Sequence, residues 1–165
     1  MKKLFYTFIL FAFAAIAFTA CKPDPIIKGS YEFFEPIMNW NSSEAEVRNQ
    51  MNSMSGWTEK PENEEANELC YIHEKTQADM RYKFDNDKLV SSSVTYFSCN
   101  DKFEQMKSDW TNKLNLDWTS ETFAGMTYYK AECEPSHCEV IIQANTNAGV
   151  DYMTIDFNYL EFFFK

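Results

Sequence analysis

The residues best suited to chemistry are two cysteines and a histidine in one short stretch. Cys133 and Cys138 enclose Glu-Pro-Ser-His, so that His137 directly precedes the second cysteine. Two thiolates and an imidazole are three of the four ligands of a structural zinc site. The same spacing suits a disulfide across the end of a β-hairpin, and the choice between the two depends on the redox compartment.

The rest of the sequence carries no catalytic signature. The four glycines are scattered, and none lies in a phosphate-binding loop. Neither a G-x-S-x-G motif nor an H-E-x-x-H motif is present. His73 and Glu74 are neighbours in an expected strand, where adjacent side chains point to opposite faces. We therefore predict no enzyme activity, no catalytic residue, no cofactor and no metal site.

The first 20 residues have the three parts of a secretory signal peptide. Lys2 and Lys3 form a basic start, residues 4–18 are apolar apart from Tyr6 and Thr7, and small residues follow. The apolar run of 15 residues is shorter than the roughly 20 that span a bilayer as a helix. We expect residues 1–20 to be removed, which places the mature chain outside the cytoplasm.

The stretch Phe18-Thr19-Ala20-Cys21 resembles the lipobox of bacterial lipoproteins. The resemblance implies a diacylglyceryl group on the Cys21 thiol, cleavage just before this residue, and often an acyl chain on the new amino group. Two or three acyl chains are enough for stable membrane anchoring. Lys22 stands where an aspartate resembles an inner-membrane retention signal. The resemblance therefore implies a cell-envelope protein anchored in the outer membrane, on its periplasmic side or at the cell surface.

The charge of the mature chain argues against two kinds of partner. Removing residues 1–20 takes away two lysines and no acid, so the formal net charge changes from −10 to −12. This sign argues against nucleic acid, whose binding depends mainly on neutralising phosphates. It also argues against a polybasic grip on anionic lipid headgroups. We expect membrane contact through the lipid at Cys21 and an envelope protein as the partner.

In an oxidising compartment, the four remaining cysteines are expected to form two disulfides. Three pairings are possible. We predict the local bridge between Cys133 and Cys138, which leaves Cys70 to pair with Cys99. This prediction also favours the disulfide over the zinc site.

The mature chain divides into a tether and one domain. Residues 21–30 contain two prolines and a glycine and read as a lipidated N-terminus with a linker. Residues 31–165 have the length of a single domain. Its first half predicts a helix that starts with the capping box Ser43–Glu46 and ends near Gly56. Strands are expected in residues 57–60, 69–73, 80–84 and 89–97.

The second half repeats this order of elements. Asn100 is a candidate cap for a helix with an apolar stripe through Met106 and Trp110, and strands are expected in residues 118–123, 126–131, 139–144 and 151–160. Trp118-Thr119 echoes Trp57-Thr58 at an offset of 61 residues. We predict an α+β fold of two tandem helix-plus-four-strand repeats, about 40–98 and 99–165. Both helices would pack on one face of an antiparallel sheet.

A second resemblance concerns this fold. Trp40-Asn41-Ser42-Ser43, followed by Glu46-Val47-Arg48, is similar to the opening of small envelope lipoproteins. These are relatives of the outer-membrane β-barrel-assembly lipoprotein and of β-lactamase-inhibitor-protein-like folds. The resemblance implies helices on one face of an antiparallel sheet and a role in binding other proteins.

Aromatic residues on the expected strands give a candidate binding face, made of Trp57, Trp118, Tyr128 and Tyr129. The first hypothesis is a non-catalytic protein-binding module held in the envelope by its lipid. The alternative is a lipoprotein receptor for a carbohydrate or small ligand on an aromatic-rich sheet face. A pocket of that second kind would need converging carboxylates, for which Glu121, Asp151 and Asp156 are candidates.

Overall fold

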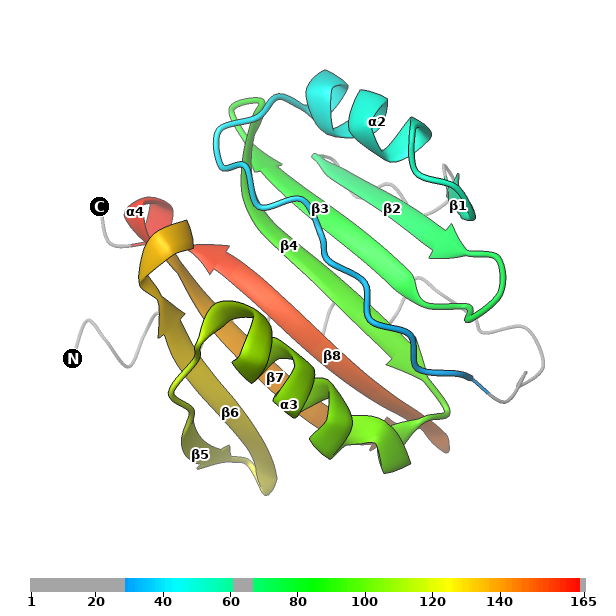
Figure 1. Cartoon of the computed structure of the whole chain (residues 1–165), viewed down its shortest axis with the longest axis vertical. Coiled ribbons are helices and arrows are strands. Elements are labelled where there is room, and N and C mark those ends of the chain that lie inside the picture. Colours follow the sequence, from blue (N-terminus) through cyan, green and yellow to red (C-terminus); the bar gives the residue numbers. More distant parts are fainter. Residues whose placement is uncertain (1–28, 61–66, 164–165) are drawn as a thin grey trace.

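The computed structural model describes residues 29–60 and 67–163 of the 165-residue chain (Figure 1). The predicted signal peptide and Cys21 lie outside these ranges. Among the described residues, no helix combines the length and apolarity needed to cross a bilayer.

Eight antiparallel strands form one sheet, in the order β1-β2-β3-β4-β8-β7-β6-β5. The strands are β1 (Trp57–Glu59), β2 (Glu68–His73), β3 (Asp79–Asp85), β4 (Lys88–Phe97), β5 (Thr119–Phe123), β6 (Met126–Cys133), β7 (Cys138–Asn147) and β8 (Val150–Tyr159). The helices are α2 (Glu44–Asn52), α3 (Phe103–Leu114) and α4 (Leu160–Phe163), and two 3₁₀ turns cover Asn100–Lys102 and Glu134–Ser136.

The predicted fold class, two tandem helix-plus-four-strand repeats with both helices packed on one face, is wrong. One continuous antiparallel sheet dominates the structure, and the helices are few, with 9, 12 and 4 residues. The prediction followed the order of elements along the chain, but this order does not specify which strands pair. In the structure the last strand, β8, pairs with β4, so the two halves of the chain share one uninterrupted ladder of hydrogen bonds.

The individual elements lie close to where the sequence predicts them. Helix α2 begins with the predicted capping box, in which the Ser43 side chain accepts from the backbone N–H of Glu46 and the Glu46 carboxylate accepts from the backbone N–H of Ser43. Asn100 does not cap the second helix. It lies in a 3₁₀ turn, and its amide donates to the carbonyl of Asn145 at 3.0 Å. Helix α3 therefore starts three residues later, at Phe103.

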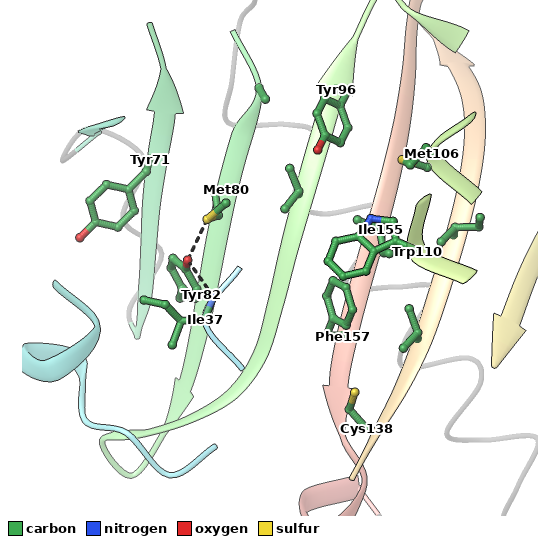
Figure 2. Close-up of a cluster of buried hydrophobic side chains, with 14 of the residues drawn as sticks. Ile37, Tyr71, Met80, Tyr82, Tyr96, Met106, Trp110, Cys138, Ile155 and Phe157 are labelled. Carbon is green, nitrogen blue, oxygen red and sulfur yellow. Dashed lines mark hydrogen bonds between the residues drawn. The ribbon is translucent and has the colours of Figure 1, made fainter. Parts of the chain in front are cut away.

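The core lies against one face of the sheet, which we call the core face. Its strand residues include Met80, Val94, Ile155 and Phe157, all fully buried. Helix α3 adds Trp110, whose ring centroid lies 4.8 Å from that of Phe157 (Figure 2). On the other half of the sheet, the Tyr82 hydroxyl contacts the sulfur of Met80 at 2.7 Å and accepts from the backbone N–H of Ile37, as Figure 2 also shows.

Residues 29–40 run along the same face between α2 and α3 (Figure 1). Phe34 packs against His73 and Trp57, with ring centroids 4.5 Å and 5.0 Å away. The Tyr31 hydroxyl donates to the Asp109 carboxylate of α3 at 2.9 Å. The chain entering the domain is thus part of the core rather than a free linker.

Gly56 provides a test of this packing, because its φ is +83° and a Cβ there would lie 2.9 Å from Nε2 of His73. A side chain in the left-handed region costs about 1–2 kcal/mol. We expect Gly56→Ala to lower the free energy of unfolding by that amount and by about 1 kcal/mol more. The additional loss arises because His73 is enclosed by Phe34 and Trp57 and cannot move away from the new methyl group. Gly125→Ala is the matched control: its φ is +82° and a Cβ there would meet nothing within 4 Å. Urea unfolding measures the free energy of unfolding of both variants. Equal losses would contradict the conclusion that His73 is held in place by its aromatic neighbours.

Candidate binding face of the sheet

The face opposite the core, which we call the polar face, carries the candidate site. Side chains alternate between the two faces along each strand, and register partners share a face. The residues beside core positions such as Met80, Val94 and Ile155 therefore belong to the polar face. Described residues on this face include Glu68, Cys70, Asp79, Arg81, Lys83, Ser91, Ser93, Thr95, Tyr152, Thr154, Asp156, Asn158, Glu139, Ile141, Gln143, Tyr128, Lys130, Glu132 and Glu121.

Hydroxyl and amide groups link the two central strands on this face. Ser91 of β4 donates to Oδ1 of Asn158 on β8 at 3.1 Å. Four residues further along each strand in register, the Thr95 and Thr154 hydroxyls lie 3.2 Å apart. These bonds fix short side chains across the β4–β8 junction, where the two halves of the chain meet.

Asp156 lies between these two links, opposite Ser93 of β4 and Ile141 of β7. Its carboxylate has no hydrogen-bond partner among residues 29–60 and 67–163. Burial raises the pKa of Asp156 to about 7, while the nearby charges of Lys83 and Arg81 act in the opposite direction. The centre of the polar face therefore holds an acid that changes its charge near neutral pH.

This shift predicts a pH dependence of stability. The folded state binds the Asp156 proton more tightly than the unfolded chain does. The contribution of this group to the free energy of unfolding is therefore greatest below the ordinary pKa of 3.8 and falls as the pH rises toward 7. We expect Asp156→Asn to flatten this slope and to stabilise the protein by about 1–3 kcal/mol at pH 8. Asp117→Asn, at an exposed position, is the control. A pH profile of Asp156→Asn that runs parallel to the wild-type profile would contradict the assignment.

A cluster of charges covers the part of the polar face formed by β2 and β3. Arg81 lies 3.8 Å from a carboxylate oxygen of Glu68 and 3.7 Å from one of Asp79. Lys60 lies 3.6 Å from the other oxygen of Asp79. The two acids are buried, so their charges require this pairing.

The part formed by β5, β6 and β7 is richer in acids. The Tyr128 hydroxyl donates to the Glu121 carboxylate at 2.6 Å, and Lys130 forms an ion pair with the same carboxylate. The hydrogen bonds from Lys130 and Tyr128 lower the pKa of Glu121. One step along the sheet, Glu132 of β6 lies directly opposite Glu139 of β7. Burial raises the pKa of Glu139, the charge of Lys130 acts in the opposite direction, and the charges of Glu132 and Glu121 add to the increase.

The four aromatic residues predicted as a binding face do not lie on one surface. Trp57, Trp118 and Tyr129 pack against the core, and Tyr129 contacts Phe103 and Lys107 of α3. Tyr128 alone points to the polar face, because it is the register partner of Glu121 and Gln143. Trp57 and Trp118 are moreover at opposite edges of the sheet.

The cysteines fall into a close pair and a distant pair. Cys133 and Cys138 are direct register partners at the β6–β7 turn, and both are buried. Burial, and then the hydrogen-bonded neighbouring thiol of Cys133, raises the pKa of Cys138 to about 12. In this structure no sulfur–sulfur bond joins any two of the four described cysteines. The pair nevertheless has the cross-strand position that a disulfide needs, so the predicted bridge stays a prediction.

The predicted partner bond between Cys70 and Cys99 does not fit this fold. Cys70 lies level with Arg81 of β3 and Ser93 of β4, whereas Cys99 comes six residues after Ser93. At about 3.3 Å per residue this is a separation of roughly 20 Å along the strand. A disulfide joins Cα atoms less than about 7 Å apart. Cys70 also lies on the polar face, while Cys99 belongs to the core.

The remaining candidate residues for chemistry lie apart from one another in the described ranges. No group of three or more His, Cys, Asp and Glu side chains in the described ranges could hold a metal ion. The Nδ1 atom of His73 lies 3.0 Å from the buried hydroxyl of Thr76. Glu121, Asp151 and Asp156 do not converge, since Glu121 lies on β5, three strands from β8, and Asp151 bonds Thr146 at the β7–β8 turn.

Three comparisons with known proteins bear on this chain. No family model, no curated protein and no solved structure matches it.

Proposed function

We propose that this chain is a cell-envelope lipoprotein, anchored in the outer membrane through Cys21, and that it binds another protein through the polar face of its sheet without catalysing a reaction. The anchor follows from the lipobox-like residues 18–21, and the mature domain faces the periplasm or the cell surface. The lipid confines the domain to the membrane and so raises the effective concentration of membrane partners.

The observation that carries the proposal is the composition of the polar face. Every one of its central strands places charged, hydroxyl or amide side chains there, and α2 and α3 contribute to the core on the opposite face. Eight strands at about 4.8 Å spacing make a sheet roughly 34 Å wide. Several side chains at the centre of this face are buried, among them Asp79, Thr154 and Asn158. A partner would therefore contact the exposed and half-buried side chains around them, such as Lys83, Ser93 and Glu132.

A role in sugar or small-ligand binding has less support. It depended on an aromatic-rich face, and three of the four predicted aromatic residues pack into the core. The carboxylates named for a pocket lie on different strands and do not converge. The geometry thus favours a broad contact with a protein surface.

Photo-crosslinking in cells tests the proposal. A photoreactive amino acid replaces Ser93, at the centre of the polar face, or Asn112, which is exposed on α3. We expect a dominant protein adduct from the Ser93 position and none from the Asn112 position. Adducts from Asn112 alone, or none from either position, would refute binding through this face.

The anchor is tested separately. We expect the mature protein to carry the mass of acyl chains on Cys21. Cys21→Ser should prevent lipidation, so that the precursor accumulates with residues 1–20 still attached. An acyl-free mature N-terminus in mass spectrometry would refute the anchor and leave the crosslinking result interpretable.

A further inference from the structure

We propose that the domain contacts the lipid bilayer directly through two apolar turns at one end of its sheet. The turns are Ala124-Gly125, between β5 and β6, and Ala148-Gly149, between β7 and β8. We call this end of the sheet the tether end. The inference rests on the proposed function, because it requires the lipid anchor at Cys21, and it adds a second membrane contact that sets how the domain stands on the bilayer.

The first observation is the composition of these turns. All four residues are exposed and have positive φ, between +50° and +82°. Two-residue hairpin turns with positive φ favour Asn-Gly or Asp-Gly, and an alanine in the left-handed region is strained. The two-residue turn between β3 and β4, Asn86-Asp87 at the opposite end of the sheet, has such polar residues. The tether end thus keeps two apolar turns at a cost in stability.

Apolar side chains continue on both sides of these turns. Phe123 is 38% exposed, and Met126 and Val150 are half-buried. A Cβ built on Gly125 or Gly149 would meet nothing within 4 Å, so both turns project into open space. Projecting apolar groups gain free energy when they move from water to the acyl boundary of a bilayer. Phe123 belongs to the polar face and lies where this membrane contact borders the protein-binding face.

The second observation is the place where the tether joins the domain. Gly29 packs against the backbone of Phe97, because a Cβ on Gly29 would collide with the Phe97 carbonyl. Phe97 is the register partner of Tyr152, which pairs with Asn145 of β7. Asn145 comes three residues before Ala148, which is about 10 Å along the strand. Figure 1 shows the first described residues and the β5–β6 turn at the same, lower end of the sheet.

The third observation is the length of the tether. Eight peptide steps separate Cys21 from Gly29, and a fully extended chain covers at most about 29 Å over that distance. This length reaches the level of both apolar turns. Lys88, at the other end of β4, lies roughly 30 Å from Phe97, so the β3–β4 turn beyond it is out of reach. With the acyl chains of Cys21 in the bilayer, the tether end is the end of the sheet that can meet the membrane.

The charges at the tether end favour an apolar contact over an electrostatic one. Exposed side chains there include the acids Glu74, Asp101 and Asp151 as well as Lys75 and Lys102. Mixed charges give no net attraction to anionic headgroups. We therefore expect the contact to be independent of anionic lipid. With both turns at the bilayer, the strands rise from the membrane and the polar face stays open to a partner from the side.

The test uses the lipidated protein from the envelope, reconstituted in phosphatidylcholine vesicles. Ala148→Cys and Asn86→Cys each place one environment-sensitive fluorophore at the first residue of a two-residue turn, with φ of +50° and +49°. The four described native cysteines are buried, so the label reacts with the new thiol. We expect the label at position 148 to emit at shorter wavelength and to be quenched by nitroxides on the lipid acyl chains. The label at position 86 should do neither, and added phosphatidylglycerol should change neither result.

A second pair of proteins separates membrane contact from a structural role of the turns. Ala124→Asn with Ala148→Asn creates two Asn-Gly turns, which should raise the midpoint of thermal unfolding by about 2–4 °C. With the fluorophore at Asn147→Cys, the same double substitution should remove most of the quenching seen with the native turns. Such opposite effects on stability and on membrane contact would not arise from a structural role alone.

The outcomes separate this inference from the proposed anchor. Protein that stays with the vesicles but shows no quenching at position 148, or equal quenching at positions 148 and 86, would overturn the membrane contact while the anchor stands. Quenching that requires phosphatidylglycerol would overturn the apolar contact as well. Protein that does not stay with the vesicles would overturn both the anchor and this inference.

Discussion

Trp110→Ala is expected to destabilise the domain by about 3–5 kcal/mol. Trp110 is fully buried, and its ring centroid lies 4.7 Å from Phe33 and 4.8 Å from Phe157. It therefore connects α3 with the chain that enters the domain and with β8, a central strand of the sheet. A loss of this size is a large part of the about 5–15 kcal/mol that stabilises a typical domain.

Urea unfolding followed by circular dichroism measures this loss. Ser120→Ala is the control, because Ser120 is exposed on the edge strand β5 and we expect a loss below about 0.5 kcal/mol. Trp110→Phe should lose much less than the alanine variant, since it keeps an aromatic ring and removes an indole N–H that has no hydrogen-bond partner. A loss below about 1 kcal/mol for Trp110→Ala would contradict the central place of α3 in the core.

The second large effect concerns the cysteines. We expect protein isolated from the envelope to contain one disulfide, between Cys133 and Cys138, and two thiols. The closed loop is short, and the loop-entropy relation gives a stabilisation of about 2 kcal/mol. Serine at both positions should lower the free energy of unfolding by this amount. Serine at Cys70 should leave the bridge intact, because Cys70 is far from the β6–β7 turn.

Alkylation before and after reduction, followed by peptide mass spectrometry, checks this assignment. Burial raises the pKa of the Cys138 thiol to about 12, so the native reduced pair should react slowly and the bridge should form during folding. Two bridges, or one that joins Cys70 to Cys99, would contradict the register of the sheet. Four free thiols in protein taken directly from the envelope would contradict the predicted bridge.

Much of the local structure could be predicted because it depends on local signals. The capping box at Ser43 and the alternation of Met153, Ile155 and Phe157 with polar residues fixed α2 and the faces of β8. The pairing of β8 with β4 could not be predicted, since both strands alternate and neither pattern specifies its neighbour. This missing information led to the incorrect expectation of two tandem repeats.

The candidate site was predicted in part. The sequence predicted Asp156 as one of three carboxylates of a pocket, and it predicted a strand over residues 80–84, which include Arg81 and Lys83. The opposition of Glu132 and Glu139 was missed, although the hairpin around Cys133 and Cys138 implies it once the register is known. The predicted aromatic binding face was wrong because Trp and Tyr occur both in cores and at interfaces. Only the face of the sheet to which each side chain points decides between the two roles.

The most direct test of the polar face is a crosslinking scan along the edge strand β5. Thr119 and Phe123 belong to the polar face and Ser120 and Thr122 to the core face, yet all four are exposed. A photoreactive residue placed at each position in turn should give the partner adduct at Thr119 and Phe123 and little at the other two. Adducts at Ser120 and Thr122 instead would show that the partner binds the helix-bearing side and would contradict the account.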